Sequence, residues 1–285
     1  MATGPGKTVR AQADNAEASM PQRPTLSAAD QPRTRLRRDG AAKPAPTMLL
    51  TLLGGFALEV DGAVVDFPTA MQRLVAVLAL RGRMSRSRLA GTLWPETTEH
   101  RALARLRTGI WRINHVTDRL VASTNGTMDL GADVDVDVRR LVAGSLAIMR
   151  AGPVASLDDA QAMIEDEGDL LPDWEDEWLL ADRERLRQMR LHVLESVAEQ
   201  LSGLGRFGLA MEVALAALRM DSLRESAHRT VISIHLAEGN VSDARRAFDR
   251  CQRIMARDVG VAPSPAITRM LAVVRSDRRP LDALA

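Results

Sequence analysis

Two segments in the C-terminal half of the chain repeat each other at an interval of 34 residues. When the segment around Gly205 is aligned with the segment around Gly239, the glycines match and Ala210 falls on Ala244. This interval is the period of tetratricopeptide helix pairs, in which small residues allow close helix contacts and each pair buries its apolar face on the next. Residues 139–276 are therefore predicted to form an all-α helical domain.

Residues 48–138 have a different pattern, in which short β-rich runs flank helical segments. The dipeptides Asp61-Gly62 and Asn125-Gly126 each lie between two such runs. Asp-Gly and Asn-Gly are typical of two-residue β-hairpin turns, because both central residues of such a turn need a positive φ. We therefore expect one hairpin near the start of this region and a second near its end.

Three helices are predicted between the two hairpins. Thr69 is expected to cap the first, residues 85–94 form a shorter second helix, and Thr97 or Thr98 precedes the third. Strands, three helices and a closing hairpin make up a winged helix-turn-helix, whose third helix enters the major groove of DNA. The predicted fold is thus mainly α, with an N-terminal α+β winged helix followed by the helical domain.

The third predicted helix, residues 98–114, carries a basic ridge opposite its apolar stripe. The stripe contains Leu103, Leu106, Ile110 and Ile113, and the ridge contains Arg101, Arg105, Thr108 and Arg112. With 100° of rotation per residue, the mean direction of the stripe and the mean direction of the ridge differ by about 180° around the helix axis. No acid occurs between Arg101 and Asn114, whereas solvated helices normally mix acids with bases. The ridge suits a polyanion such as double-stranded DNA; a plain surface helix is the alternative.

Charge is distributed unevenly along the chain. Residues 1–47 contain eight basic residues (Lys or Arg) and four acidic ones (Asp or Glu), and residues 48–126 contain ten basic and six acidic residues. Residues 127–285 contain twenty basic and twenty-seven acidic residues, so the excess of positive charge is confined to the front of the chain. A basic front half and an acidic back half fit a nucleic-acid binder fused to a protein-interaction module.

Both ends of the chain are predicted to be tails. Residues 1–47 are predicted to be a disordered basic tail, and residues 277–285 a C-terminal tail. The start of translation, Met1 or Met48, stays open.

Several other kinds of function are not indicated. Cys251 is the single cysteine, so no intrachain disulfide can form, and a buried structural thiol is expected. No apolar run reaches the roughly 18 residues that span a bilayer, and the N-terminus does not resemble a signal peptide. We therefore expect a soluble cytoplasmic protein. The histidines lack metal-ligand spacing, no phosphate-binding loop is present and no catalytic constellation assembles, so no metal, cofactor or enzyme activity is predicted.

Two conspicuous clusters are interpreted as structural. Asp133, Asp135 and Asp137 alternate along one segment, which predicts a solvated strand face leading into a helix rather than a cation site. Trp174 and Trp178 lie among acids at a helix start. Acids suit a helix N-terminus and tryptophans suit packing, which favours a structural role over an acidic partner patch.

The order of parts resembles the SARP-type bacterial transcriptional activators, which join an OmpR-type winged helix to a bacterial transcriptional activator domain of tetratricopeptide-like helices. The resemblance covers residues 48–276 and rests on four segments. They are LARLRTGIWRIN (103–114), LLPDWEDEWLLADRERLR (170–187), ALRMDSLRESAHRTVISIHLAEGN (217–240) and DVGVAPSPAI (258–267). The first looks like the recognition helix of the family, and the others look like stretches of its activator domain.

The resemblance and the charge pattern together give a candidate DNA-binding set. It consists of Arg101, Arg105, Arg107, Thr108 and Arg112 on the third helix, Ser85, Arg86, Ser87 and Arg88 at the start of the second, and Asn125 in the wing. Arginine suits guanine edges and phosphates. For Arg107 we favour phosphate contact, with packing or solvation equally open. The second-helix start could bind phosphate or simply form an N-terminal cap.

The wing departs from the family pattern. The family wing commonly ends in an aromatic residue followed by a basic one, whereas this chain has no basic residue between Arg119 and Arg139.

The resemblance also implies two kinds of partner. The loop 94–100 corresponds to the family segment that meets RNA polymerase, and the family implies self-association on direct-repeat DNA. We therefore predict a sequence-specific DNA-binding transcriptional regulator of the activator type. The alternative is a tetratricopeptide-type interaction scaffold whose winged helix no longer binds DNA.

Overall fold

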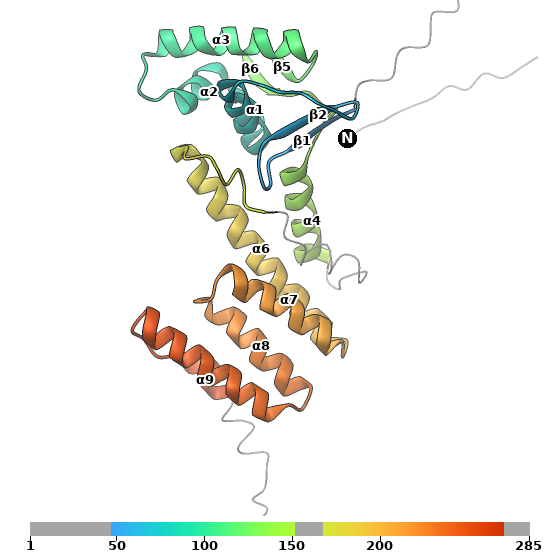
Figure 1. Cartoon of the computed structure of the whole chain (residues 1–285), viewed down its shortest axis with the longest axis vertical. Coiled ribbons are helices and arrows are strands. Elements are labelled where there is room, and N and C mark those ends of the chain that lie inside the picture. The colour runs from blue at the N-terminus through green and yellow to red at the C-terminus, as the bar shows by residue number, and fades with distance from the viewer. Residues whose placement is uncertain (1–46, 152–167, 271–285) are drawn as a thin grey trace, which may run out of the picture. The chain divides into compact units, whose positions relative to one another are not determined.

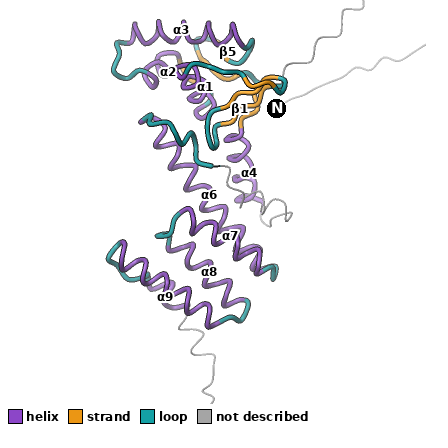
Figure 2. Tube along the Cα trace, in the orientation of Figure 1, coloured by secondary structure: helices purple, strands orange, loops and turns teal. Residues whose placement is uncertain are grey.

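The computed structural model of the chain describes residues 47–151 and 168–270. Two predicted regions therefore lie outside the described residues, namely the basic tail except for residue 47, and the C-terminal tail. The described residues contain two small sheets and a series of helices, in the order drawn in Figure 1. Figure 2 shows that the strands belong to the N-terminal part, whereas the described residues after α4 form helices and their connections.

The first sheet has four strands in the order β3-β2-β1-β7. The strands are β1 (Met48–Thr51), β2 (Ala57–Val60), β3 (Ala63–Val64) and β7 (Val134–Val136). Asp61 and Gly62 have φ values of 52° and 80° in the turn between β2 and β3, as the hairpin prediction requires. β7 pairs with β1 in parallel, so the sheet also includes a strand from the far end of the winged helix.

Three helices and a second sheet complete the winged helix. The helices are α1 (Thr69–Arg81), α2 (Arg86–Leu93) and α3 (Glu99–Val116). The sheet has the order β4-β6-β5, with β4 (Met84–Ser85), β5 (Val121–Thr124) and β6 (Thr127–Leu130). Asn125 and Gly126 have φ values of 50° and 78° in the β5-β6 turn, so the predicted closing hairpin is confirmed.

The helix starts were predicted with one error. Ser85 is the N-cap of α2, where its Oγ accepts a hydrogen bond from the Arg88 N–H at 3.2 Å, and Thr98 occupies the N-cap of α3. Thr69, however, is the first residue of α1 rather than its cap. Pro68 stands at that N-cap, and its lack of an N–H costs nothing where the backbone donors of a helix are unpaired anyway.

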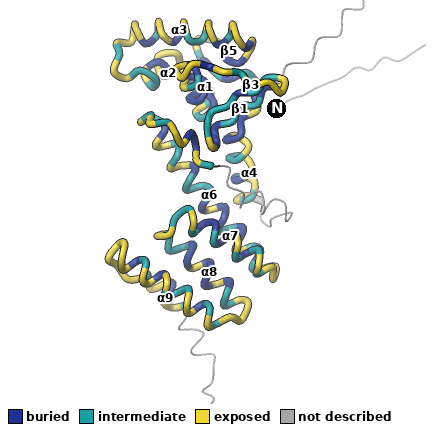
Figure 3. The backbone as a smooth tube through the Cα atoms, in the orientation of Figure 1, coloured by how far each residue is buried: buried dark blue, intermediate teal, exposed yellow. Residues whose placement is uncertain are grey.

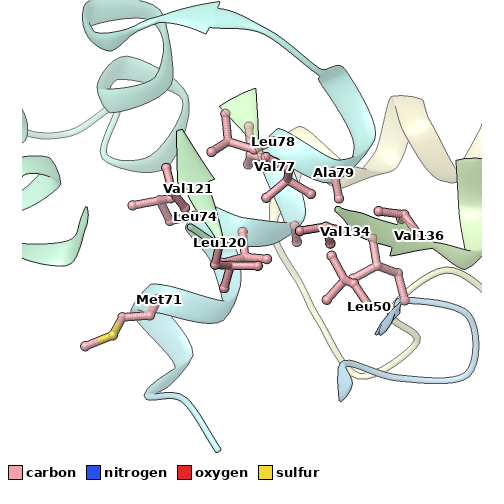
Figure 4. Close-up of a cluster of buried hydrophobic side chains, with 14 of the residues drawn as sticks. Leu50, Met71, Leu74, Val77, Leu78, Ala79, Leu120, Val121, Val134 and Val136 are labelled. Atoms are coloured by element: carbon pink, nitrogen blue, oxygen red, sulfur yellow. The ribbon is translucent and has the colours of Figure 1, made fainter. Parts of the chain in front are cut away.

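The core of the winged helix lies between the helices and both sheets. Figure 4 shows Leu74 and Leu78 of α1 among side chains from β1, β5 and β7, including Leu50, Val121 and Val136. Leu50, Leu74, Leu78 and Val136 are each at most 1% exposed. Side chains more than 60 positions apart in the sequence thus pack into one core, and this core supports α3.

The remaining helices form the predicted helical domain, and α7 and α9 contain the matched segments of the repeat. They are α4 (Asp137–Ala151), α6 (Glu177–Gly203), α7 (Phe207–Met220), α8 (Glu225–Ala237) and α9 (Val241–Asp258). Gly205 and Gly239 have φ values of 73° and 86° just after α6 and α8. In both places the next N–H bonds back to the helix, from Arg206 to the Leu201 carbonyl at 2.9 Å and from Asn240 to the His235 carbonyl at 2.8 Å.

The small residues of the repeat lie where the pattern predicts. Ala210 of α7 and Ala244 of α9 are both 0% exposed. A helix crossing that buries an alanine completely leaves no room for a larger side chain unless the helices separate. The match of both the helix-ending glycines and the buried alanines confirms the tetratricopeptide-like character of the helical region.

Asp137 corrects the interpretation of the alternating aspartates. Asp133 and Asp135 are exposed on a wet strand face as predicted, but Asp137 is only 8% exposed. Its Oδ2 accepts hydrogen bonds from the N–H groups of Leu52 and Leu53 at 2.7 and 2.8 Å, just beyond β1. A carboxylate becomes stable in such a buried place when backbone donors surround it.

The two tryptophans near the start of α6 have structural contacts. Trp174 stacks on Phe56 with 6.1 Å between ring centroids, and the Trp178 Nε1–H donates to Asp176 at 3.1 Å. The Arg81 guanidinium lies 5.7 Å from the centre of the Trp178 ring. These contacts agree with the predicted packing role of both rings.

Candidate nucleic-acid interface

α3 has one face in the core and one in solvent. Ala102, Leu106 and Ile113 are buried, and Leu103 and Ile110 pack against the same core while partly buried. Figure 3 shows α3 with a continuous exposed side along its outer edge. The spacing of three and four residues therefore separates the two faces as the sequence predicts.

All ten residues of the predicted DNA-binding set have exposed side chains. They are Ser85, Arg86, Ser87, Arg88, Arg101, Arg105, Arg107, Thr108, Arg112 and Asn125. Within the described ranges, none of the six arginines in this set forms an ion pair. Arginines elsewhere do find carboxylates, for example Arg224, which lies 2.6 Å from a Glu195 oxygen. Positive charge is thus left uncompensated on α2 and α3.

Two polar groups of the α3 ridge have local hydrogen bonds. The Arg105 Nη1 donates to Thr97 Oγ1 at 3.2 Å, which ties the ridge to the loop before α3. The Thr108 hydroxyl donates to the Ala104 carbonyl at 3.2 Å. Arg105 keeps further donors free, because a guanidinium carries five N–H groups. Thr108 turns its hydroxyl toward the helix, so its methyl group is the part available to a ligand.

Arg107 and the start of α2 share one hollow. A cavity of about 460 Å³ opens between the two helices and is lined by Arg86, Ser87, Leu103, Leu106, Arg107 and Ile110. Two guanidinium groups thus lie around an apolar floor. This arrangement brings three members of the predicted set together, while Arg101, Arg105 and Arg112 follow the other side of α3.

The start of α2 also contacts the wing. The Arg86 Nη2 donates to Ser123 Oγ in β5 at 3.0 Å. The Ser85 hydroxyl is used as the N-cap of α2, which is the structural alternative considered for this residue. Asn125, at the tip of the hairpin, is exposed in a left-handed turn.

Bases from outside the hairpin compensate the acidic wing. Asp129 of β6 lies 3.8 Å from Arg83 and 3.9 Å from Arg139, measured between charged atoms. Arg83 precedes β4, which pairs with β6, so the sheet brings a base to a hairpin that has none in its own sequence. Sequence reasoning missed Arg83 because it considered only residues between Arg119 and Arg139.

Trp111 is a second residue that sequence reasoning missed. Its side chain is 65% exposed on the solvent face of α3, beside the arginines. The helical spacing contains the signal, because Trp111 comes three residues after Thr108 and lies outside the apolar stripe. A tryptophan outside the core stripe of a basic helix can serve as an apolar contact surface.

Among the described residues, no group of His, Cys, Asp and Glu could hold a metal ion. No helix there combines the length and apolar character that crossing a bilayer requires. The predicted set offers guanidinium and hydroxyl groups at α2 and α3 and an amide in the β5-β6 turn. Such groups recognise phosphates and base edges.

A winged helix with an arginine-rich third helix, followed by paired helices, defines the class of two-part transcriptional regulators. Residues 134–275 match the bacterial transcriptional activator domain family. The chain belongs to the SARP-type bacterial transcriptional activators.

A solved structure of EmbR has the same fold. It is the structure of Mycobacterium tuberculosis EmbR in complex with a low-affinity phosphopeptide, and its TM-score is 0.64 at 19% sequence identity. The similarity covers 82% of this chain and 67% of the EmbR chain. The comparison with curated protein sequences gave no match.

Proposed function

We propose that this chain is a sequence-specific DNA-binding transcriptional activator that reads the major groove with α3. The observation that carries the proposal is the set of exposed arginines on α2 and α3 without ion-pair partners among the described residues. Phosphates supply most of the affinity in protein-DNA complexes, and base edges supply the specificity. A helix with an apolar inner face and a basic outer face offers both kinds of contact.

Different arginines are assigned different roles. Arg107 and Arg86 flank the same hollow between α2 and α3, which supports their assignment to phosphates on one side of the groove. Arg101 and Arg112 follow the outer ridge, where a two-pronged guanidinium can reach guanine. Arg105 combines a bond to Thr97 with free donors, so it can hold the loop and contact DNA together.

The wing is assigned a supporting role at the neighbouring backbone. Asn125 offers an amide at the hairpin tip, and Arg86 is bonded to Ser123 beside it. Asp129 would repel phosphates if it were unpaired, but Arg83 and Arg139 lie near its carboxylate. These neighbours support DNA binding by a wing whose own sequence lacks bases.

Activation is assigned to the loop before α3 and to the helical domain. We propose that the segment at residues 94–100 contacts RNA polymerase and that residues 139–276 contact polymerase or a neighbouring protomer on DNA. The bond between Arg105 and Thr97 supports this, since it links the loop to the DNA-reading helix. We also propose that the chain divides into its two domains between residues 138 and 139, within the first turn of α4.

Footprinting of genomic DNA with the purified full chain tests the proposal. We expect an enriched sequence motif, binding that weakens steeply with salt, and protection on one face of the duplex. The exposed pair Arg101→Ala and Arg112→Ala should reduce binding, while Arg206→Ala outside the winged helix should not.

The competing function is an interaction scaffold, which the acid-containing wing favours. A scaffold would give no enriched motif at any salt concentration. In that case the helical domain would be the functional part, and its partners would be found by crosslinking in cell extract.

A further inference from the structure

Trp111 differs from the other tryptophans of the chain in its surroundings. Trp94, Trp174 and Trp178 are partly buried and pack against the core of the winged helix. Trp111 is 65% exposed on α3. Indole is among the largest apolar side chains, so this residue places an unusually large apolar surface in solvent.

The ring is held in a defined orientation. It stacks on the imidazole of His115, one helical turn away, with 5.4 Å between ring centroids and 11° between ring planes. Residues four apart are neighbours on a helix surface. His115 is itself exposed, so this contact supports the indole from one side without covering it.

Trp111 flanks the basic ridge of α3 on the side of Arg107. It is three residues from Thr108 and four from Arg107, which makes all three neighbours on the helix surface, and all three are exposed. The Thr108 hydroxyl is bonded to the Ala104 carbonyl, so Thr108 adds a methyl group to the same surface. The face therefore combines guanidinium groups with a patch of apolar atoms.

The chemistry of this patch matches one base. In the major groove only thymine presents a methyl group, and its O4 acceptor lies beside that methyl. An indole offers an apolar ring and one N–H donor, and within the described part of the chain the Trp111 Nε1–H has no hydrogen-bond partner. Arginine cannot provide both a large apolar face and an N–H donor on one rigid ring, because its side chain is a flexible chain that ends in a charged guanidinium.

We propose that Trp111 is a specificity-determining residue that recognises thymine in the major groove by packing its indole against the C5-methyl group. The proposal rests on the function proposed above, because it requires α3 to lie in the groove. His115 acts as a positioning residue that keeps the ring in place. Arg101 and Arg112 keep the roles in charge and guanine contact proposed above.

The test compares thymine with deoxyuridine, which differs only by the missing methyl group. The full-length protein is first used to select a motif from random duplex DNA. Each thymine of the motif is then replaced singly by deoxyuridine, and dissociation constants are measured for the parent, Trp111→Ala and Trp111→Phe. Leu180→Ala is the matched control, because Leu180 is an exposed apolar residue of α6, 58% exposed.

At one thymine or more, we expect the parent to bind the deoxyuridine duplex about fourfold more weakly, the equivalent of one methyl group removed from a contact. Trp111→Ala should bind the two duplexes equally and should select a motif in which that thymine is no longer enriched. Trp111→Phe should keep part of the preference, and Leu180→Ala should keep all of it. Circular dichroism confirms that each variant is folded.

Three results would overturn the proposal, and the first two separate it from the function on which it rests. If the parent protein selects a motif and the Trp111→Ala variant keeps the same thymine preference, the role of Trp111 is overturned and DNA reading by α3 is left intact. A parent that selects no motif would overturn both. Loss of nonspecific binding in Trp111→Ala, with an unchanged motif, would also contradict thymine recognition, because it would indicate a backbone contact.

Discussion

The Asp137 carboxylate is bound to the backbone of Leu52, with 2.7 Å between Oδ2 and the amide nitrogen. The same oxygen accepts the Leu53 N–H, and the other carboxylate oxygen accepts the N–H of Val138 at 2.6 Å. One buried side chain thus satisfies backbone donors at the end of β1 and at the start of α4.

Asp137→Ala should destabilise the protein. It would leave the Leu52 and Leu53 N–H groups buried without an acceptor, and hydrogen bonds to charged groups contribute about 1.5–3 kcal/mol each. We expect the free energy of unfolding in urea to fall by about 3 kcal/mol. Asp135 is exposed and serves as the control. Asp135→Ala should change the free energy of unfolding by less than about 0.5 kcal/mol. Equal effects of the two variants would contradict the structural role of Asp137.

Substitutions on the two faces of α3 should have opposite consequences. Arg112→Ala removes an exposed charge, so stability should change by less than about 0.5 kcal/mol, while specific DNA binding should weaken by about 1–3 kcal/mol if the residue reads a base. If Arg112 instead holds a phosphate, specific and random DNA should weaken together and the salt slope should fall by about one. Fluorescence anisotropy at several salt concentrations distinguishes these outcomes.

The core-facing counterpart is Leu106, which is 1% exposed. Leu106→Ala should cost about 2–5 kcal/mol by leaving a cavity, and DNA binding should be lost only as the protein unfolds. Thermal unfolding followed by circular dichroism measures the effect. A folded Arg112→Ala variant that binds specific DNA like the parent would show that the ridge is not the reading surface.

Enlarging a repeat alanine should disrupt the helical domain. Ala244 is 0% exposed, so Ala244→Phe should overpack its helix crossing at a cost of about 1–3 kcal/mol. Ala256→Phe is the control, because Ala256 is exposed on the same helix. An unchanged melting temperature for Ala244→Phe would count against the 34-residue register.

The Cys251 thiol should resist alkylation in the native protein. Burial raises the pKa of Cys251 to about 11, with a smaller contribution from the charge of Glu225. Only the thiolate reacts with iodoacetamide, so labelling at pH 8 should be at least about a hundredfold slower in the native than in the urea-unfolded chain. Similar rates in the two states would show that the thiol is accessible.

The same shift sets a pH dependence of stability. Because the folded pKa lies above the value of 9.0 for a free thiol, the stabilising contribution of the neutral thiol is fully present below pH 9 and is lost as the pH rises toward 11. Cys251→Ala should remove this part of the alkaline destabilisation in urea titrations at pH 8 and pH 10.

Features encoded by neighbouring residues could be predicted from the sequence. The turns at Asp61-Gly62 and Asn125-Gly126 need a local backbone conformation that few residue pairs adopt, and both have it. The glycines at 205 and 239 end their helices for the same kind of local reason. The exposed ridge of α3 also followed from spacing alone, because an α-helix fixes which residues share a face.

Features that depend on distant parts of the chain could not be predicted. The parallel pairing of β7 with β1 joins Met48 to Val134, and no local pattern specifies that partner. Asp137 is buried only because β1 ends beside it. The partial neutralisation of Asp129 by Arg83 likewise depends on the pairing of β4 with β6. The roles of the arginines on DNA stay predictions, since side-chain chemistry alone fits both bases and phosphates.

Arginines without carboxylate partners repel one another when no ligand is present. Arg101, Arg105 and Arg112 recur along one side of α3, so free protein will draw a cloud of small anions to this helix. Under the proposed function, DNA must displace that cloud before its phosphates can take the same positions. We therefore expect the apparent affinity for DNA to depend on which anion the buffer contains as well as on ionic strength, because strongly held anions compete for the same guanidinium groups.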